Sequence, residues 1–335
     1  FEVIIPTADI AYLATWTASK FPVEPSSEIE LQRRSAFVVD GIHENIEYLG
    51  AQQLFAIRSS SDRCRAGGPT VVLYPTANEH RVGPVRMWVE LARLLPRFGV
   101  STVRFDRRGT GESGSVGDGE LTRLYSDEGN EDALTAVRQS GTTPDNVLVA
   151  GMCSGSWYSS FAARELGVRA AVLLNTLDWT TRRLEFVKRS SMHIEETGLK
   201  ARALDRLHHW GVRIKNALQP RIPYALWIWL GRRGLIQVPE ISLRILSDRR
   251  VQTRVLLSPS DTAWFETNRG PEGMRRLQRR SSVPTVTSFA SGDHSLYGRD
   301  LRENVRAELV TAASAAFDIE IAAPSPPVPV GKVRL

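Results

Sequence analysis

Cysteine and histidine are scarce in this sequence. Its 335 residues include two cysteines, Cys64 and Cys153, and six histidines. Two cysteines cannot form a network of disulfide bonds, and the lack of a C-x-x-C motif argues against a metal site. No run of eighteen apolar residues is present, so we expect no transmembrane helix. These features predict a cytoplasmic protein without a metal ion or another cofactor.

The excess of one sign of charge is small. The sequence has 43 basic and 37 acidic side chains, a net charge of +6, and 42% hydrophobic residues. This composition is ordinary for a soluble domain with a full core. The basic excess favours an anionic ligand, such as a carrier-protein surface or a phosphate-bearing thioester. No groove-reading motif occurs, so we expect no nucleic-acid partner. The oligomeric state is left open.

The chain divides into segments with different patterns. Residues 1–35 combine a stretch of helical spacing, "DIAYLATWTASKF", with a linker, "PVEPSSE", which predicts an N-terminal appendage packed on the main domain. Strands and helices then alternate in residues 36–177 and 251–320, the predicted core. A long helical segment, residues 178–250, interrupts this alternation and is interpreted as a cap. Residues 321–335 form a proline-rich tail, expected to be extended or disordered.

The core segments predict a mostly parallel, eight-stranded sheet with helices on both faces. The first two strands pair antiparallel around Gly50, and the others are connected by helical crossovers. Ligands bind at the carboxyl ends of such strands. The remaining strands are expected within 70–75, 100–106, 146–151, 170–175, 253–261 and 284–294. The helices are expected within 82–99, 130–141, 156–167, 272–280 and 302–317. The first helix should end at Gly99, and the second should be capped by Asn130.

A cluster of small residues follows the strand predicted at 146–151. It reads Gly151-Met152-Cys153-Ser154-Gly155, the G-x-Nu-x-G spacing of a nucleophile elbow with cysteine at the centre. Strand and helix approach closely in such a turn, so both flanking positions must be small. A frame centred on Ser154 would put Met152 in one of them, which favours Cys153 as the nucleophile. A buried structural cysteine is the alternative interpretation.

Few histidines lie where a catalytic partner of Cys153 is expected. An elbow nucleophile is followed along the chain by an acid and then by a histidine. His294 lies in a glycine-containing loop after a strand, "SFASGDHSLYG", and is the predicted base. Asp261, after the strand "TRVLL", is the favoured acid, and Asp178, after the strand "AAVLLN", is its rival. Either aspartate could instead cap a helix.

Together these motifs resemble the α/β-hydrolase fold from about residue 36 to residue 318. The stretch "RFDRRGTGESG", residues 104–114, is similar to the D-x-R-G-x-G-x-S loop of many members of that family. The resemblance extends to a bacterial subgroup with a G-x-C-x-G elbow and a Pro-x-x-x-Glu loop, and to dienelactone-hydrolase-like enzymes and thioesterases, in which cysteine elbows occur.

The resemblance also implies an oxyanion hole. One donor would be the backbone N–H of Ser154, and the other would come from the loop "YPTANEHR", residues 74–81, through Thr76 or Ala77. The helix after the elbow would favour a thiolate at Cys153. Glu79 either fixes this loop through a hydrogen bond or is solvated.

A thiol nucleophile points to acyl transfer. It would form a thioester intermediate in the hydrolysis of a small-molecule ester or thioester, such as one presented by coenzyme A or an acyl carrier protein. Two alternatives remain: an acyltransferase or cyclase that passes the acyl group to an amine, alcohol or thiol in a biosynthetic pathway, and a non-catalytic binding protein. The cap is expected to face Cys153 and to set acyl specificity with its aromatic cluster, Tyr224, Trp227 and Trp229.

Overall fold

The computed structural model describes two units of the chain, residues 1–35 and 36–335. Within the first unit, helix α1 (Thr7–Lys20) confirms the helical spacing read from the sequence. The structure describes residues 7–21, 35–77, 79–114, 124–180, 222–280, 282–322 and 332–334.

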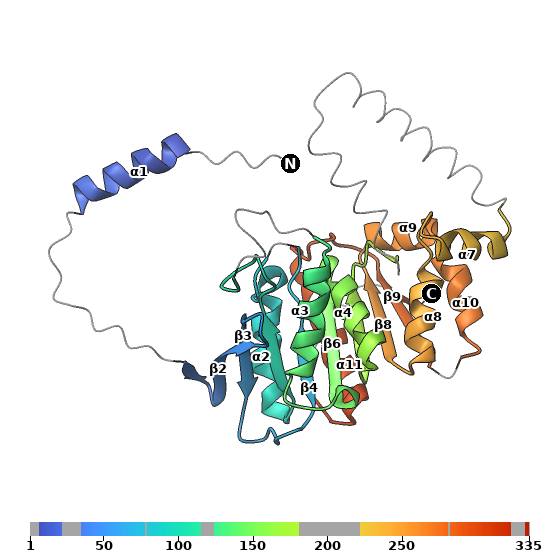
Figure 1. Ribbon diagram of the computed structural model, residues 1–335, viewed down its shortest axis with the longest axis horizontal. Helices are drawn as coiled ribbons and strands as arrows, with labels where there is room; N and C mark the ends of the chain where they lie inside the picture. The colour runs from blue at the N-terminus through green and yellow to red at the C-terminus, as the bar shows by residue number, and fades with distance from the viewer. Residues whose placement is uncertain are drawn as a thin grey trace. The chain divides into compact units, whose positions relative to one another are not determined.

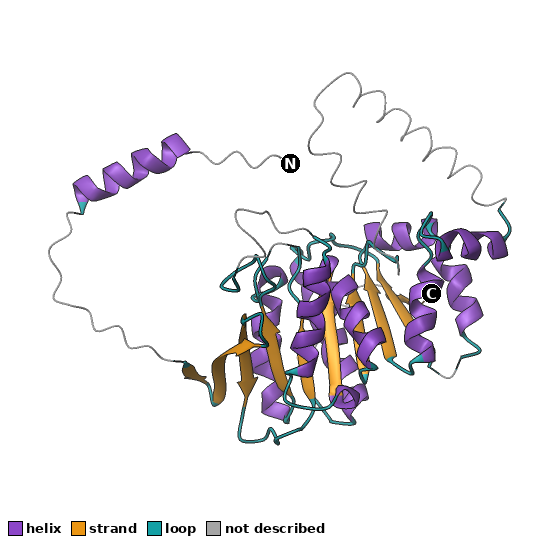
Figure 2. Cartoon of the chain, viewed as in Figure 1, coloured by secondary structure: helices purple, strands orange, loops and turns teal. Residues whose placement is uncertain are grey.

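The second unit is built on one sheet (Figures 1 and 2). Its strands follow the order β1-β2-β3-β5-β4-β6-β7-β8-β9-β10. Strands β4 to β9 run parallel, and β1 to β3 and β10 join as antiparallel strands. The strands are β1 (Ala36–Val39), β2 (Ile42–Leu49), β3 (Leu54–Ser60), β4 (Thr70–Leu73), β5 (Ser101–Phe105), β6 (Val147–Met152), β7 (Ala170–Leu174), β8 (Gln252–Leu257), β9 (Thr285–Phe289) and β10 (Lys332–Arg334).

The eight strands expected from the sequence correspond to β2 to β9. The structure adds an antiparallel strand at each edge of the sheet, β1 and β10. The second of these lies in the proline-rich tail, where Lys332 to Arg334 pair with β9. The rest of the tail, 323–331 and 335, lies outside the described residues.

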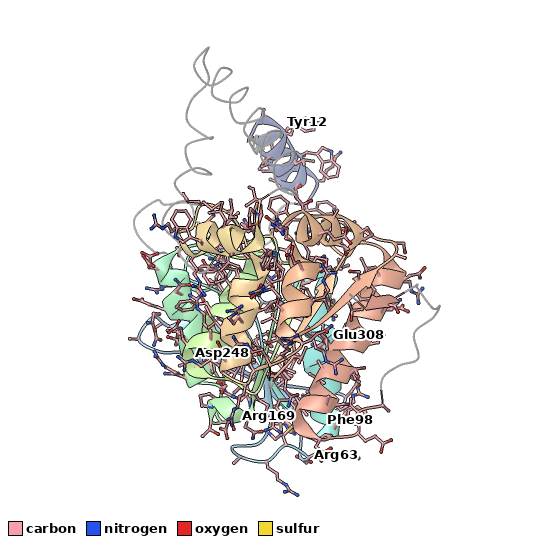
Figure 3. All side chains as sticks on the ribbon, turned by 90° about the vertical axis from the view of Figure 1, so that its right-hand side faces the viewer. Tyr12, Arg63, Phe98, Arg169, Asp248 and Glu308 are labelled. Atoms are coloured by element: carbon pink, nitrogen blue, oxygen red, sulfur yellow. The ribbon has the colours of Figure 1, made fainter. Side chains whose placement is uncertain are left out.

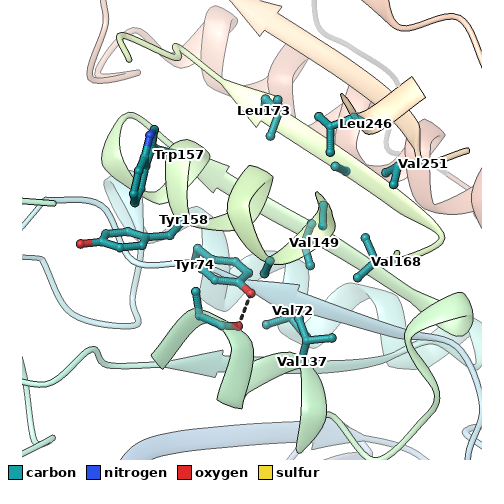
Figure 4. Packing of buried hydrophobic residues seen from close by; sticks show 14 of the residues in the cluster. Val72, Tyr74, Val137, Val149, Trp157, Tyr158, Val168, Leu173, Leu246 and Val251 are labelled. Atoms are coloured by element: carbon teal, nitrogen blue, oxygen red, sulfur yellow. Dashed lines mark hydrogen bonds between the residues drawn. The ribbon is translucent and has the colours of Figure 1, made fainter. Parts of the chain in front are cut away.

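Helices cover both faces of the sheet, as predicted (Figure 1). One hydrophobic cluster joins the sheet to α3, α4, α8, α9 and α10, and a second joins it to α2 and α11. Figure 4 shows part of the first cluster, in which the hydroxyl of Tyr74 donates to the carbonyl of Ala133 at 2.8 Å. The helices are α2 (Met87–Leu94), α3 (Asp127–Arg138), α4 (Ser154–Leu166), α8 (Pro239–Asp248), α9 (Pro259–Thr267), α10 (Gly270–Leu277) and α11 (Arg299–Phe317).

Three helix predictions need correction. The helix expected over 82–99 is α2 flanked by short 3-10 turns, although Gly99 does end it with a φ of 84°. Helix α3 is capped by Ser126, whose hydroxyl accepts the N–H of Gly129, so the prediction of Asn130 as the cap was wrong. Helix α9 was not predicted at all.

Helix α3 contains a glycine, Gly129, for a tertiary reason. A Cβ at Gly129 would lie 2.4 Å from the hydroxyl of Tyr158. Glycine weakens a helix interior, which is why the sequence favours a start after it. Here the close approach of α4 requires glycine within the helix.

The predicted cap is described only in part, because residues 181–221 lie outside the described ranges. Helix α7 (Tyr224–Arg232) buries Trp227 in a small cluster with Tyr224 and Val238, which does not include Cys153. Helix α8, also assigned to the cap from the sequence, places Leu243 and Leu246 in the core of the sheet. The described end of this segment therefore packs beside the core.

The carboxyl ends of the parallel strands lie along one side of the sheet, and the loops of the predicted site begin there. In Figure 3, Arg169 and Phe98, which precede β7 and β5, lie at the opposite edge. None of the helices in the described ranges is long and apolar enough to cross a membrane.

Candidate active site

The backbone turns sharply at Cys153. This residue follows β6 and has a φ of 54° and a ψ of −116°. A Cβ at Gly151 would lie 2.1 Å from the carbonyl oxygen of Gly155, and a Cβ at Gly155 would lie 2.6 Å from that of Pro75. Both glycines are thus required by backbone contacts. A non-glycine residue in such a conformation costs about 1–3 kcal/mol and is found most often at functional sites.

Helix α4 begins directly after Cys153. The side chain of Cys153 is half-buried. Its position places the sulfur near the positive end of the helix dipole, which stabilises a negative charge. The Ser154 side chain is instead buried, and its Oγ accepts a hydrogen bond from the N–H of Ala77 at 2.7 Å.

His294 lies against Asp261. The imidazole Nδ1 is 2.9 Å from Oδ1 and 3.0 Å from Oδ2 of Asp261, whose side chain is buried. Asp261 stands in the first turn of α9, after β8. Interactions with Asp261 and then with Cys153 raise the pKa of His294 to about 10, although burial opposes the shift. Hydrogen bonding to the carboxylate and the proximity of the thiol thus both favour the protonated form of the imidazole.

The rival acid, Asp178, is buried without contacting His294. Its Oδ1 accepts the N–H of Thr180 at 2.7 Å. Desolvation by burial raises the pKa of Asp178. The structure therefore brings Asp261, and not Asp178, to the imidazole.

The loop after β4 crosses the elbow. Thr76 Oγ1 donates to the carbonyl of Met152 at 3.1 Å, and the N–H of Ala77 is occupied by Ser154 Oγ. Among the described residues, no acceptor bonds the N–H of Thr76 or of Ser154. Glu79 has an exposed side chain and contributes its backbone N–H to the carbonyl of Thr76 at 2.8 Å.

Comparison with protein families is decisive for the fold. The model of the alpha/beta hydrolase family matches residues 81–308, which is more than half of the chain. The chain belongs to the α/β-hydrolase family. The matched range includes Cys153, Asp261 and His294, and it begins after the loop that carries Thr76 and Ala77.

Three enzymes or enzyme domains of known structure are among the matches. A dienelactone hydrolase from Anabaena variabilis has a TM-score of 0.50 at 12% identity, over 84% of this chain and 98% of that one. The thioesterase domain of the curacin biosynthetic pathway has a TM-score of 0.42 at 16% identity, over 82% of this chain and 99% of that one. An acetyl xylan esterase from Thermoanaerobacterium has a TM-score of 0.48 at 15% identity, over 87% of this chain and 89% of that one. No curated protein sequence matches this α/β hydrolase.

The hydrolase motif around Asp106 fixes the far end of the loop after β4. The buried Asp106 carboxylate accepts the backbone N–H of Arg81 at 2.6 Å and that of Glu112 at 3.1 Å. A Cβ at Gly111 would lie 2.1 Å from this carboxylate, and Ser113 Oγ donates to the Asp106 carbonyl at 2.8 Å. The motif therefore has a structural role beside the site.

Sequence reasoning missed Asn175. Its Nδ2 donates to the carbonyl of His294 at 2.7 Å, and its Oδ1 accepts the N–H of Ser258 at 2.8 Å. Ser258 in turn donates its hydroxyl to Asp261 Oδ2. One buried amide thus links the loops of His294 and Asp261. The only signal in the sequence was an asparagine at the end of a strand, where its left-handed φ of 45° is tolerated.

Within the described ranges, no group of three or more His, Cys, Asp or Glu residues is placed to bind a metal ion.

Proposed function

We propose that this α/β hydrolase cleaves an ester or thioester through a covalent acyl intermediate on Cys153. The observation that carries the proposal is the placement of His294, whose Nδ1 lies 2.9 Å from Asp261 Oδ1 and whose pKa is raised by Asp261 and by the thiol of the elbow. The burial of Ser154 and the use of its hydroxyl by Ala77 support Cys153 over Ser154 as the nucleophile.

In the first half-reaction, the Cys153 thiolate attacks the carbonyl carbon of the substrate. A sulfur–carbon bond forms, and the carbonyl oxygen becomes an oxyanion. The N–H groups of Ser154 and Thr76 are the proposed donors to this oxyanion, because Ala77 already uses its N–H within the protein. Collapse of the intermediate breaks the bond to the leaving group, which takes the proton of the His294 imidazolium.

The second half-reaction regenerates the thiolate. His294, now neutral, accepts a proton from a water molecule, whose oxygen attacks the thioester carbonyl carbon. The carbon–sulfur bond then breaks, which releases the carboxylic acid product and leaves the thiolate beside the imidazolium. Asp261 holds the ring and stabilises its positive charge throughout.

A second candidate function is acyl transfer to an amine, alcohol or carrier thiol. The identity of Cys153 favours this candidate, because a thioester intermediate is more reactive toward amines than an ester, and exchange between thiols and thioesters is nearly balanced in energy. The net charge of +6 is compatible with an acyl donor carried by coenzyme A or by an acidic carrier protein.

Intact-protein mass spectrometry tests the proposal. The protein is exposed to a panel of acyl thioesters and p-nitrophenyl esters, and each adduct is located by peptide mapping. We expect one acyl group on Cys153, lost in Cys153→Ala and kept in Cys64→Ala, a matched change at the other half-buried free cysteine. Labelling retained in Cys153→Ala would exclude Cys153 as the nucleophile, and a wild type that takes up no acyl group would favour a binding protein.

Product analysis separates the two enzymatic candidates. The purified protein is incubated with a reactive acyl thioester, first in buffer and then with an added amine, alcohol or thiol acceptor. Release of the free acid at the same rate in both conditions indicates hydrolysis. Formation of the amide, ester or new thioester at the expense of the acid indicates transfer.

A further inference from the structure

Ala77 is held on both sides of its α-carbon. Its N–H donates to Ser154 Oγ at 2.7 Å, and its carbonyl oxygen accepts a hydrogen bond from Arg107 Nη2 at 2.5 Å. The residue has a φ of 47°, in the left-handed region that alanine rarely adopts. A backbone conformation of this kind persists only where the surroundings fix it.

Both contacts trace back to one face of α4. Ser154 is its first residue, and Tyr158 lies four residues later, on the same side of the helix. The Tyr158 hydroxyl accepts a hydrogen bond from Arg107 Nη1 at 3.1 Å, and the guanidinium carbon is 5.0 Å from the centre of the ring. In Figure 4 this hydroxyl points away from the packed cluster. Because Arg107 is only 1% exposed, it has little freedom to move.

We propose that Ser154 and Arg107 are positioning residues that hold the loop after β4 in the shape needed to stabilise the oxyanion. This inference rests on the proposed function. Cys153, the proposed nucleophile, lies at the start of helix α4. The same helix would hold the loop after β4 in two ways: Ser154 bonds Ala77 directly, and Tyr158 bonds Arg107, which bonds Ala77. Donors that are held in place before the reaction need no reorganisation in the transition state, which is the source of their catalytic effect.

The inference separates two reactions of the same thiol. Acylation by an ester builds negative charge on a carbonyl oxygen and needs the oxyanion donors. Alkylation by iodoacetamide displaces iodide and develops no oxyanion. A loop that is no longer held in shape should therefore slow the first reaction and spare the second.

Ser154→Ala is the main test, with p-nitrophenyl acetate and iodoacetamide as probes. Loss of an oxyanion donor costs about 10²–10³ in rate, so loss of a residue that positions one should cost at least about tenfold in kcat with little change in KM. Alkylation of Cys153 should stay within about twofold of the wild type. Ser154→Thr, which keeps the hydroxyl, should recover part of the acylation rate.

Ser159→Ala is the matched control. Ser159 is a buried serine of the same helix, whose hydroxyl donates to the carbonyl of Ser156 at 3.0 Å. This variant should acylate at the rate of the wild type. Equal acylation by Ser154→Ala and the wild type would overturn the inference, as would an equal loss of acylation and alkylation, which would show a damaged elbow.

The outcome also distinguishes failure of the inference from failure of the proposed function. A wild type that acylates Cys153, with Ser154→Ala equally fast, removes the positioning role alone. Acylation that persists in Cys153→Ala removes the proposed function and the inference with it. Arg107→Met is a second variant, expected to slow acylation without affecting alkylation, and its effect should add less than fully to that of Ser154→Ala because both act on Ala77.

Discussion

At the scale of single residues, the charge of His294 suits the thiol nucleophile that we propose at Cys153. Asp261 and Cys153 raise the pKa of His294 to about 10, so the ring carries its second proton at neutral pH. A serine at position 153 would need a neutral imidazole to accept its proton, whereas a thiolate is already a nucleophile. The protonated ring is then ready to donate to the leaving group.

The pH dependence of acylation follows from this charge. The imidazolium is present below about pH 10 and is lost above it, since the pKa of His294 is raised to about 10. We expect the rate of acylation of Cys153 to fall as the pH rises through about 10. Alkylation by iodoacetamide needs only the thiolate and should not fall. Stopped-flow rates for both reagents between pH 6 and about 11 measure the difference.

Asp261→Asn provides the control for this profile. Asp261 is the largest cause of the raised pKa of His294, and an amide cannot stabilise the imidazolium charge in the same way. The pH at which acylation begins to fall should therefore be lower in this variant. If the acylation rate of Asp261→Asn falls at the same pH as that of the wild type, the role given to Asp261 is contradicted. A lower pH for this fall in Asp178→Asn would instead point to Asp178.

At the scale of elements, the site is assembled by loops that leave neighbouring parallel strands at one edge of the sheet. Strand β6 leads to Cys153, β8 to Asp261 and β9 to the loop of His294. Strand β7 lies between β6 and β8 and is followed by Asn175, whose side-chain amide bonds the loops after β8 and β9. The alignment of Asp261 and His294 thus depends on a residue that follows β7, although neither of the two lies after that strand.

Asn175→Ala should weaken this alignment. The change leaves the buried N–H of Ser258 without its acceptor, which typically costs about 1–3 kcal/mol of stability. We expect a lower free energy of unfolding in urea and a fall of more than about tenfold in the acylation rate. Asn304→Ala is the comparison, since the side chain of this buried asparagine donates to the carbonyl of Asp300 within the same helix, α11. Similar acylation losses in the two variants would argue against a specific role for Asn175.

At the scale of the whole molecule, all residues of the proposed site belong to one unit. Cys153, Asp261 and His294, and the loop after β4, lie within 36–335, and the sheet itself begins at Ala36. The unit has a hydrophobic cluster on each face of its sheet. A unit with its own core is expected to fold by itself.

A chain that begins at residue 36 should therefore keep the site. We expect it to melt cooperatively, and to acylate Cys153 within about twofold of the rate of the full chain, because the described residues of the site draw on contacts inside the unit. Circular dichroism melting and the mass assay measure both properties. A loss of acylation in a well-folded truncated chain would show that residues 1–35 contribute to the reaction.

The features that the sequence determined are those with local causes. Gly151 is required by the carbonyl of Gly155, four residues away, and continuous apolar runs mark strands that are covered on both faces. The common edge of parallel strands then brings the loops of Asp261 and His294 together. This is why their pairing could be predicted from the order of strands and loops.

Tertiary structure decided what depends on contacts between distant residues. Asn175 joins loops 83 and 119 residues away, and Ser154 reaches Ala77 across 77 residues, so neither pairing leaves a periodic signal. Likewise, Gly129 lies inside α3 because the Tyr158 hydroxyl needs the space of a missing side chain. Hydrogen bonds of this kind depend on where strands and helices meet in space, whereas residue spacing records only the faces that each element buries.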